Sequence, residues 1–246
     1  MKGVVLVALL EIQNLVSGYG KMAIIQDISL SVDPGDFVAL VGPNGSGKST
    51  LVKSILNLTN IFEGKVFFDG KNISGEKTEK IAEMRLGYVP QISNVFSDMS
   101  VAENLEMGSA ILKKGSKKKE IFQRVVTLFP ILEARSRQRA GLLSGGERQM
   151  LAVGRALMGD PKLIILDEPT AALAPMAAEQ LFQKLEEIRT KLGVAIILVE
   201  QNARKALGLA NRGIVLVQGK KVFEGTPDQV LKDTEIIRLF LGELTI

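Results

Sequence analysis

Short apolar runs alternate with turn residues over the first third of the chain. β-Branched and aromatic residues make up most of each run, and turn signals such as Asp33-Pro34-Gly35 and Asp69-Gly70 separate them. Short runs bounded by Gly, Pro and Asp are typical of β-strands. We therefore predict strands at Ile28–Val32, Phe37–Val41, Lys65–Phe68 and Leu86–Val89.

The pattern changes at about residue 92. Up to residue 140, apolar residues recur at helical spacing among many charges, as in IFQRVVTLFPIL. Beyond Leu142, the apolar runs LIILD and AIILV alternate with helical patterns near 147–158 and 176–191. Continuous apolar strands indicate a parallel sheet buried on both faces, and strand–helix alternation indicates an α/β core. We predict one domain over residues 1–246, with a core of 1–91 and 141–246 and an inserted helical subdomain at 92–140.

The composition is that of a globular protein, and it excludes several kinds of chemistry. Of the 246 residues, 46% are hydrophobic and 24% are charged, which suits a large buried core. The absence of cysteine excludes disulfides, and the absence of histidine excludes imidazole ligands and Ser-His triads. No segment has the roughly twenty apolar residues that cross a bilayer. We expect other chains to hold the protein at any membrane where it works.

The net charge does not identify one class of partner. A net charge of +4 suits nucleotides, anionic lipid or nucleic acid. The lysines from Lys113 to Lys119 form a run of the kind that is usually a solvated face, so we predict no nucleic-acid binding. The start MKGVVLVALL lacks a small-residue cleavage site, and we predict a buried strand or an extended segment there.

A glycine-rich segment carries the first functional motif. Gly42–Ser49 matches G-x-x-x-x-G-K-[ST], after the strand Phe37–Val41 and before a predicted helix at Ser49–Leu58. In this motif main-chain N–H groups face phosphates, Lys48 reaches the β- and γ-phosphates, and the Ser49 hydroxyl ligates Mg²⁺. The predicted ATP contacts are Gly42, Pro43, Asn44, Gly45, Ser46, Gly47, Lys48, Ser49 and Thr50.

Two carboxylates end the apolar run KLIILDEP. The carboxyl ends of parallel strands meet at one edge of a sheet, so we expect Asp167 and Glu168 beside the phosphate loop. Asp167 would hold Mg²⁺ through water, and Glu168 would orient and deprotonate the attacking water. The alternative is that the two acids only end the strand before Pro169. The phosphate loop makes this alternative the less favoured interpretation.

The segment LLSGGERQMLAVGRALMGDPKLIILDEPT, from Leu142 to Thr170, resembles the ATP-binding cassette ATPases, and the resemblance covers nearly the whole chain. In that family two subunits join head to tail, and the signature motif of one covers the ATP held by the other. The resemblance gives this role to Ser144, Gly145, Gly146 and Glu147, and a serine with glycines before a helix is also an anion-binding terminus. It implies a P-loop NTPase fold: a mixed sheet core, an antiparallel β subdomain and the inserted helical subdomain.

The resemblance also assigns single positions. Tyr19 is similar to the aromatic residue that stacks on adenine, although an ordinary core tyrosine is the alternative. Gln91 in GYVPQ is similar to the glutamine that contacts Mg²⁺ and opens the helical subdomain, which receives the coupling helix of a membrane subunit. Ala174 stands where a loop of the family usually ends in aspartate, and this departure questions a polar contact across the dimer.

The run AIILV stops at three polar residues, Glu200, Gln201 and Asn202. Near this point the family has a histidine that contacts the γ-phosphate, and Gln201 occupies its place. An amide can donate to a phosphate oxygen but takes up no proton near neutral pH. If Gln201 is the γ-phosphate sensor, Glu168 must be the base. The alternative is a surface glutamine that only ends the strand.

The segments MSVAENLEMG, ALAP and LVEQNARKAL narrow the resemblance to one ATPase of the branched-chain amino-acid importers. The urea and short-amide importers share the pattern. The resemblance implies an ATP- and Mg²⁺-dependent ATPase, peripheral on the cytoplasmic face of the membrane. Its implied partners are a second cassette subunit in a heterodimer, or a second copy in isolation, two transmembrane permeases and, indirectly, an extracytoplasmic solute-binding protein.

Two other classes of protein remain as alternatives. A soluble cassette ATPase could act on DNA or ribosomes, but chromosome-type members need a long coiled coil between the phosphate loop and the signature. The segment between Lys48 and Ser144 shows no sustained heptads. A binding module without hydrolysis is disfavoured because Lys48, Asp167 and Glu168 are all present.

Overall fold

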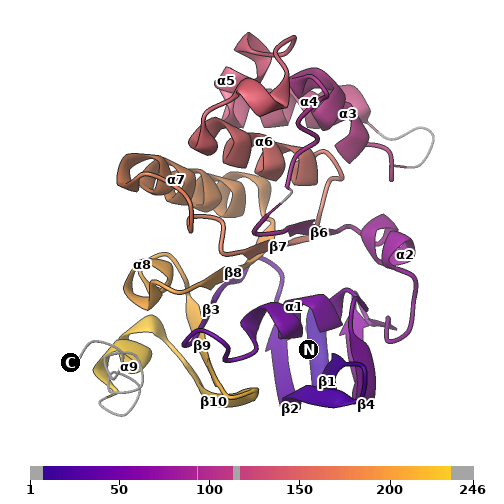
Figure 1. The fold of residues 1–246 in the computed structure, drawn as a ribbon, viewed down its shortest axis with the longest axis vertical. Coiled ribbons are helices and arrows are strands. Elements are labelled where there is room, and N and C mark those ends of the chain that lie inside the picture. Colours follow the sequence, from indigo (N-terminus) through magenta and orange to yellow (C-terminus); the bar gives the residue numbers. More distant parts are fainter. Residues whose placement is uncertain (1–7, 93, 113–116, 234–246) are drawn as a thin grey trace, which may run out of the picture.

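The protein is layered around a central β-sheet. The computed structural model describes residues 8–92, 94–112 and 117–233. Residues 1–7, Lys113 and Lys114 therefore lie outside the described part of the chain. Figure 1 shows helices α6 and α7 on one side of the central sheet, and helix α1 with a smaller sheet on the other.

The central sheet has six strands in the order β10-β9-β3-β8-β7-β6. Its strands are β3 (Phe37–Val41), β6 (Leu86–Val89), β7 (Leu163–Asp167), β8 (Ala195–Glu200), β9 (Arg212–Val217) and β10 (Lys220–Gly225). All neighbours pair in parallel except β10, which is antiparallel to β9. The predicted mixed α/β sheet is confirmed, and β3 and β6 have the bounds read from the sequence.

The smaller sheet is antiparallel and has the order β2-β1-β4-β5. Its strands are β1 (Leu10–Tyr19), β2 (Met22–Val32), β4 (Asn60–Phe68) and β5 (Lys71–Asn72). Strands β2 and β4 are longer than predicted. Their first halves are largely exposed, so they lack the apolar run by which we recognised the buried halves.

Ten helical segments occur in the described residues. They are α1 (Lys48–Ile55), α2 (Thr78–Glu83), α3 (Val101–Gly108), α4 (Lys118–Leu128), α5 (Pro130–Ala134), the 3-10 helix η1 (Ala140–Leu142), α6 (Gly145–Leu157), α7 (Pro175–Leu192), α8 (Ala203–Leu207) and α9 (Pro227–Lys232). Helices α3, α4 and α5 fall inside the segment 92–140, and Figure 1 shows them beside α6, on the side of α7 that faces away from the sheet.

Helix α1 ends earlier than the predicted Ser49–Leu58. Asn57 has a positive φ of 54°, a conformation that asparagine tolerates better than most residues. Its side-chain amide donates to the carbonyls of Ile73 and Glu76 at 2.5 and 2.9 Å. These contacts fix the chain outside helical geometry, and the sequence pattern alone did not show them.

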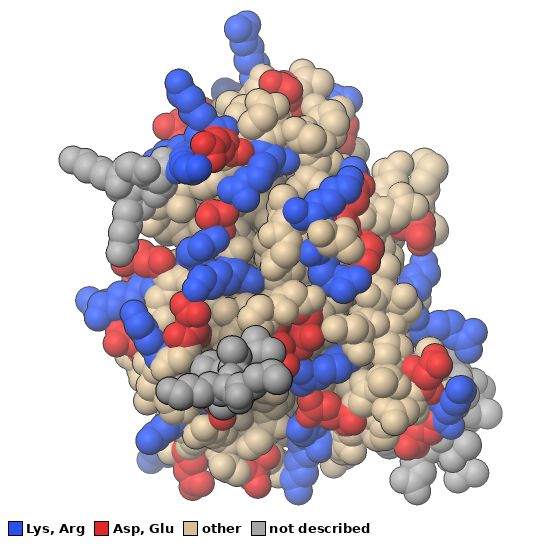
Figure 2. All heavy atoms as spheres, turned by 180° about the vertical axis from the view of Figure 1, so that it is seen from behind, with Lys and Arg blue, Asp and Glu red and all other residues tan. Residues whose placement is uncertain are grey.

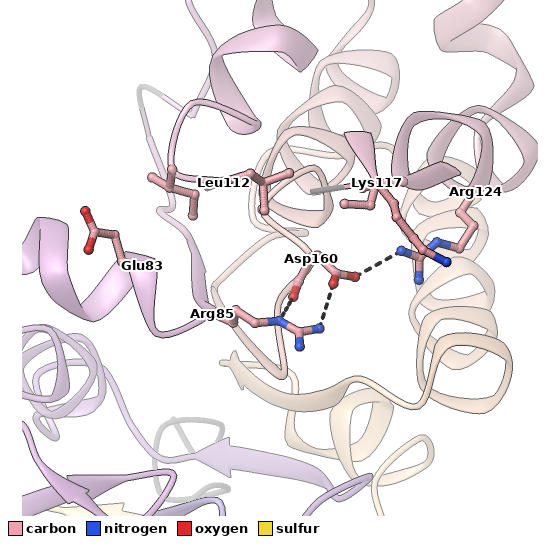
Figure 3. A pocket seen from close by; sticks show the side chains of 9 residues that line it. Glu83, Arg85, Leu112, Lys117, Arg124 and Asp160 are labelled. Carbon is pink, nitrogen blue, oxygen red and sulfur yellow. Dashed lines mark hydrogen bonds and ion pairs between the residues drawn. The ribbon is translucent and has the colours of Figure 1, made fainter. Parts of the chain in front are cut away.

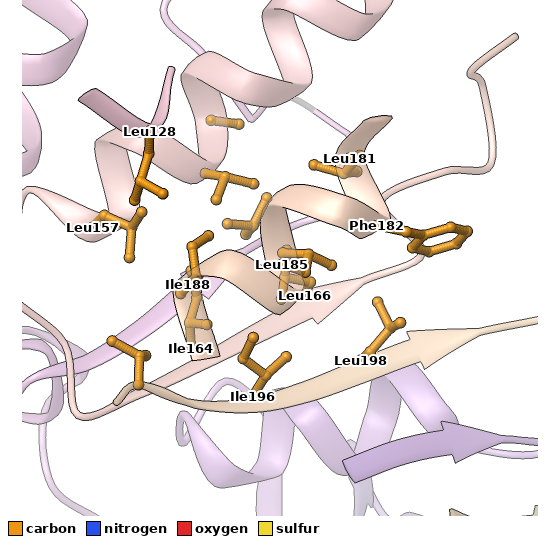
Figure 4. Packing of buried hydrophobic residues seen from close by; sticks show 14 of the residues in the cluster. Leu128, Leu157, Ile164, Leu166, Leu181, Phe182, Leu185, Ile188, Ile196 and Leu198 are labelled. Atoms are coloured by element: carbon orange, nitrogen blue, oxygen red, sulfur yellow. The ribbon is translucent and has the colours of Figure 1, made fainter. Parts of the chain in front are cut away.

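The central strands bury both faces. Alternate residues of β3, β7 and β8 belong to two separate apolar clusters, one on each side of the sheet. Figure 4 shows the helical side, where Ile164, Leu166, Ile196 and Leu198 pack against Leu181, Phe182, Leu185 and Ile188 of α7. Full burial of one such side chain contributes roughly 1.5–3 kcal/mol. The two clusters make the sheet a rigid frame for the residues at its carboxyl edge.

The surface carries mixed charge. On the face seen in Figure 2, basic and acidic side chains of the described residues are interspersed. No helix of the described residues is both long and apolar enough to cross a membrane.

Candidate nucleotide site

The loop after β3 leads directly into α1. Gly47 is the N-cap of α1, with a φ of 102°, and an added Cβ would lie 2.9 Å from Ile25 Cδ1. A residue with a side chain would be strained and crowded there. No side chain caps α1, and its first turn has no acidic residue. The first N–H groups of the helix and its dipole therefore suit an anion.

Two polar side chains of this loop are held inward. Lys48 is buried, and its Nζ donates to the carbonyls of Gly42 and Pro43 at 2.8 and 3.1 Å. The Ser46 hydroxyl is also buried and has no hydrogen-bond partner among the described residues. A buried hydroxyl without a partner is costly. A phosphate oxygen in the loop would satisfy it.

Asp167 ends β7 at the edge of the sheet next to α1. Its Oδ1 accepts a hydrogen bond from the Ser49 hydroxyl at 3.0 Å. Burial raises the pKa of Asp167, and the hydrogen bond from Ser49 opposes that rise. The Tyr88 hydroxyl, at the end of β6, also bonds to Asp167, and burial followed by this carboxylate raises the pKa of Tyr88. Sequence reasoning missed Tyr88. Its hydrogen bond orients the carboxylate that we predict to bind the metal.

Glu168 contacts three other predicted site residues. Its Oε2 accepts from the amide Nε2 of Gln201 at 2.7 Å and of Gln91 at 3.1 Å. Its Oε1 lies 3.9 Å from Lys48 Nζ. Glu168 is buried and has a positive φ of 46°, which costs a residue with a side chain backbone strain. Four residues predicted from separate motifs are thus brought into contact.

The other two polar residues at the end of β8, Glu200 and Asn202, have separate partners. Glu200 is buried, and its Oε1 accepts from the hydroxyl and main-chain N–H of Thr170 at 2.7 and 3.2 Å. Asn202 caps α8 by accepting from the N–H of Lys205 at 3.2 Å. The sequence showed that the apolar strand ends in three polar residues, but it did not show the hydrogen bonds between Glu200 and Thr170.

The segment Ser144–Glu147 begins α6 with a capping box. The Ser144 N–H donates to Glu147 Oε2 at 2.9 Å, and the Glu147 N–H donates to the Ser144 hydroxyl at 3.3 Å. Glu147 Oε1 lies 3.1 Å from Arg135 Nε. The hydrogen bond from the Ser144 N–H chiefly lowers the pKa of Glu147. Ser144 is exposed at this helix start.

Tyr19 and Ala174 lie at two further ends of elements. Tyr19 is the last residue of β1 and is 44% exposed, in the hairpin turn that pairs it with Met22. Helix α1 contacts β1, and the Ser17 and Ser54 hydroxyls of these two elements lie 2.7 Å apart. Ala174 is the N-cap of α7 and offers no side-chain hydrogen bond there.

The fold and the site define a P-loop ATPase with a signature helix. Residues 25–171 match the family model described as ABC transporter. The chain is 39% identical to the high-affinity branched-chain amino acid transport ATP-binding protein BraG of Pseudomonas aeruginosa, over 95% of this chain and all of that protein. It is 38% identical to the probable branched-chain amino acid transport ATP-binding protein LivF of Archaeoglobus fulgidus, over 95% and 99% of the two chains.

Solved structures agree with this relationship. An ATP-binding cassette of an ABC transporter in its ADP conformation superposes with a TM-score of 0.85 at 27% identity, over 96% of this chain and 99% of that one. A dimeric cassette bound to ADP and Pi gives a TM-score of 0.77 at 26% identity, over 89% and 98%. The chain belongs to the ABC transporter family and is an ATP-hydrolysing cassette. ATPases of this family work as dimers with membrane-spanning permeases.

Proposed function

We propose that the chain is an energising subunit of a branched-chain amino-acid importer. The observation that carries this proposal is the similarity to BraG and LivF over nearly the full length of all three chains. The protein would lie at the cytoplasmic face of the membrane, held there by two permease subunits. A second, different cassette subunit would complete the dimer.

The contacts around Glu168 support a mechanism for hydrolysis. Lys48 donates to two loop carbonyls, and both glutamine amides donate to Glu168. A γ-phosphate beside this cluster would draw Lys48 and the Gln201 amide to its own oxygens, because both are donors. Glu168 would then accept a hydrogen bond from water and take its proton, as a general base does.

Magnesium fits the oxygen donors beside the loop. The Ser49 hydroxyl and the Asp167 carboxylate lie 3.0 Å apart, and Gln91 can add its amide oxygen. Mg²⁺ binds few protein oxygens and keeps several waters, which suits this small set. When bound, it would neutralise charge on the phosphate oxygens.

The signature supports a composite site. Ser144, Gly145 and Gly146 begin a helix whose first N–H groups suit an anion, and the same chain already has a phosphate loop at α1. We infer that the signature covers ATP held by the partner cassette. ATP would then join the two subunits, and hydrolysis would let them separate.

A groove between helix α4, the segment after α3 and the residues before β6 and β7 is the proposed docking place for a permease. This cavity of about 400 Å³ is lined by Glu83, Arg85, Ile111, Leu112, Lys117, Ile121, Arg124, Gly159 and Asp160. Figure 3 shows Asp160 between two arginines, with ion pairs of 2.8 Å to Arg85 and 3.0 Å to Arg124. The apolar side chains Ile111, Leu112 and Ile121 suit the apolar face of a cytoplasmic helix of the permease.

The first test is copurification. Glu168→Gln in the full chain, trapped with MgATP in its own host, should bring down a second cassette subunit and two multispan proteins from solubilised membranes. A branched-chain amino acid should then bind the cognate solute-binding protein. Urea or a short amide as the ligand would keep the importer and change its substrate. Ribosomes or DNA without a membrane protein would overturn the transport proposal.

The groove has its own test. Leu112→Arg should abolish copurification of the permeases, because a long charged side chain occupies the groove. Val222→Arg changes an exposed residue of β10 in the same way and should leave it intact. Equal permease recovery with both variants would exclude the groove as the docking place.

A further inference from the structure

Glu200 is a buried acid that the mechanism above does not use. It ends β8 and is 3% exposed. Its described partners are N–H and O–H donors, and no lysine or arginine is among them. A buried carboxylate without a basic partner is costly unless hydrogen bonds satisfy it. Its presence at this place therefore calls for an explanation.

The carboxylate joins two segments of the site. It accepts both donors of Thr170, at 2.7 and 3.2 Å, and the main-chain N–H of Gln201 also donates to it. Thr170 follows Pro169 and starts the segment Thr170–Ala174. Gln201 places its amide on Glu168 at 2.7 Å. One side chain therefore fixes the backbone beside the proposed γ-phosphate sensor and the start of the next loop.

That loop leads into α7 and contacts the signature. A Cβ on Gly145 would lie 3.6 Å from Leu173 Cδ2 and 3.9 Å from the carbonyl of Ala172. The segment Thr170–Ala174 therefore packs against the start of α6. The Leu173 N–H donates to the carbonyl of Thr170 at 3.0 Å. A connected path of contacts therefore runs from Glu168 through Gln201, Glu200, Thr170 and Leu173 to Gly145.

We propose that Glu200 is a positioning residue for ATP hydrolysis, which holds Gln201 on Glu168 and ties both to the loop that contacts the signature. It does not touch the reacting atoms. It acts by keeping the amide of Gln201 and the carboxylate of Glu168 in position relative to each other. Small displacements of such groups slow catalysis strongly. The part that involves Gln201 as sensor and the signature as partner contact rests on the proposed function.

The experiment compares steady-state ATP hydrolysis of full-chain variants. Glu200→Ala and Thr170→Val should each lower kcat by about 10–100-fold and leave the KM for ATP within about threefold. Thr170→Ser keeps the hydroxyl and should hydrolyse ATP at close to the wild-type rate. Thr170→Val is nearly isosteric, so it decides the question if Glu200→Ala does not fold.

A double-mutant cycle separates positioning from a merely structural role. If Glu200 acts through Gln201, Glu200→Ala should lower kcat little further in a Gln201→Ala background, because contacting residues that act as a unit are not additive. Wild-type kcat in Thr170→Val, or full additivity with Gln201→Ala, would overturn the proposal. An unchanged kcat in Gln201→Ala alone would instead reject the sensor assignment, while the two single-variant results would still test whether Glu200 and Thr170 matter.

Discussion

The end of β8 shows how three adjacent polar residues acquire three different roles. Glu200 points into the protein and bonds to Thr170, Gln201 bonds to Glu168, and Asn202 caps α8. Glu200 is the last residue of β8, whereas Gln201 and Asn202 follow the strand and lead into α8, so no common strand face holds the three side chains in one environment. The three polar residues at the end of the buried strand thus connect the sheet to Thr170, to the proposed base Glu168 and to helix α8.

Gln201 should matter for turnover and not for ATP binding. We expect Gln201→Ala to lower kcat by about 100-fold, the usual cost of removing one donor that stabilises transition-state charge. ATP affinity should change little, because the loop Gly42–Thr50 is untouched. Asn202→Ala is the neighbouring control: it removes a helix cap, should cost about 1 kcal/mol of stability and should leave kcat near wild type. Single-turnover hydrolysis and nucleotide titration measure both quantities, and wild-type turnover in Gln201→Ala would reject the sensor role.

At the scale of elements, α7 begins without a cap. Its N-cap, Ala174, has the extended backbone that capping side chains require, with φ −61° and ψ 149°. Ala174→Asp should therefore add a cap and a favourable charge at the helix start, raising the free energy of unfolding by about 0.5–2 kcal/mol. Ala172→Asp adds the same charge to the preceding loop without cap geometry. Urea denaturation should show a gain only for the first variant, and equal shifts would mean that charge alone matters.

Helices α3 and α6 cross closely at Gly108. A Cβ there would lie 2.1 Å from the main-chain oxygen of Arg155, which cannot move aside as a flexible side chain can. Gly108→Ala should destabilise the protein by about 1–3 kcal/mol through overpacking. Gly208→Ala is matched, because the nearest atom there is 3.4 Å away. Thermal unfolding should separate the two, and a loss of stability in both would point to a general effect of replacing glycine.

The sequence predicted the elements that a local run of apolar residues marks. It missed those that depend on contacts with distant parts of the chain. Strands β3 and β6 are short and buried, so their bounds follow from apolar runs. The exposed halves of β2 and β4 and the early end of α1 at Asn57 depend on pairing and side-chain contacts across the fold. The same holds for the site. Motifs predicted Lys48, Asp167, Glu168 and Gln201, but Tyr88 and Thr170 became visible only through their contacts with those carboxylates and with Glu200.

At the scale of the whole molecule, the sheet separates two kinds of surface. Its carboxyl edge gathers the phosphate loop, the acids of β7 and the polar end of β8. The helices α3–α5 lie on the side where α6 and α7 cover the sheet (Figure 1). The groove at Asp160 is lined by residues that precede β6 and β7, away from the carboxyl edge. Buried residues of α6 and β7 belong to one packed cluster, so the proposed signature helix and the acidic strand share one apolar core. This arrangement suits a protein in which nucleotide and permease must influence each other.

A head-to-tail dimer makes a geometric prediction that this chain is well suited to test, since it contains no cysteine. Asn44 in the phosphate loop and Ser144 in the signature are both exposed. Asn44→Cys and Ser144→Cys, made in separate copies that also carry Glu168→Gln, should form a disulfide between chains when mixed with ATP and an oxidant. The bond forms only where Cα atoms approach within about 7 Å. Met107→Cys, on the exposed face of α3, is the control partner for Asn44→Cys and should stay unlinked. Equal cross-linking of both pairs would argue against a site shared between phosphate loop and signature. No cross-link with ATP would argue against such a site between two copies of this chain.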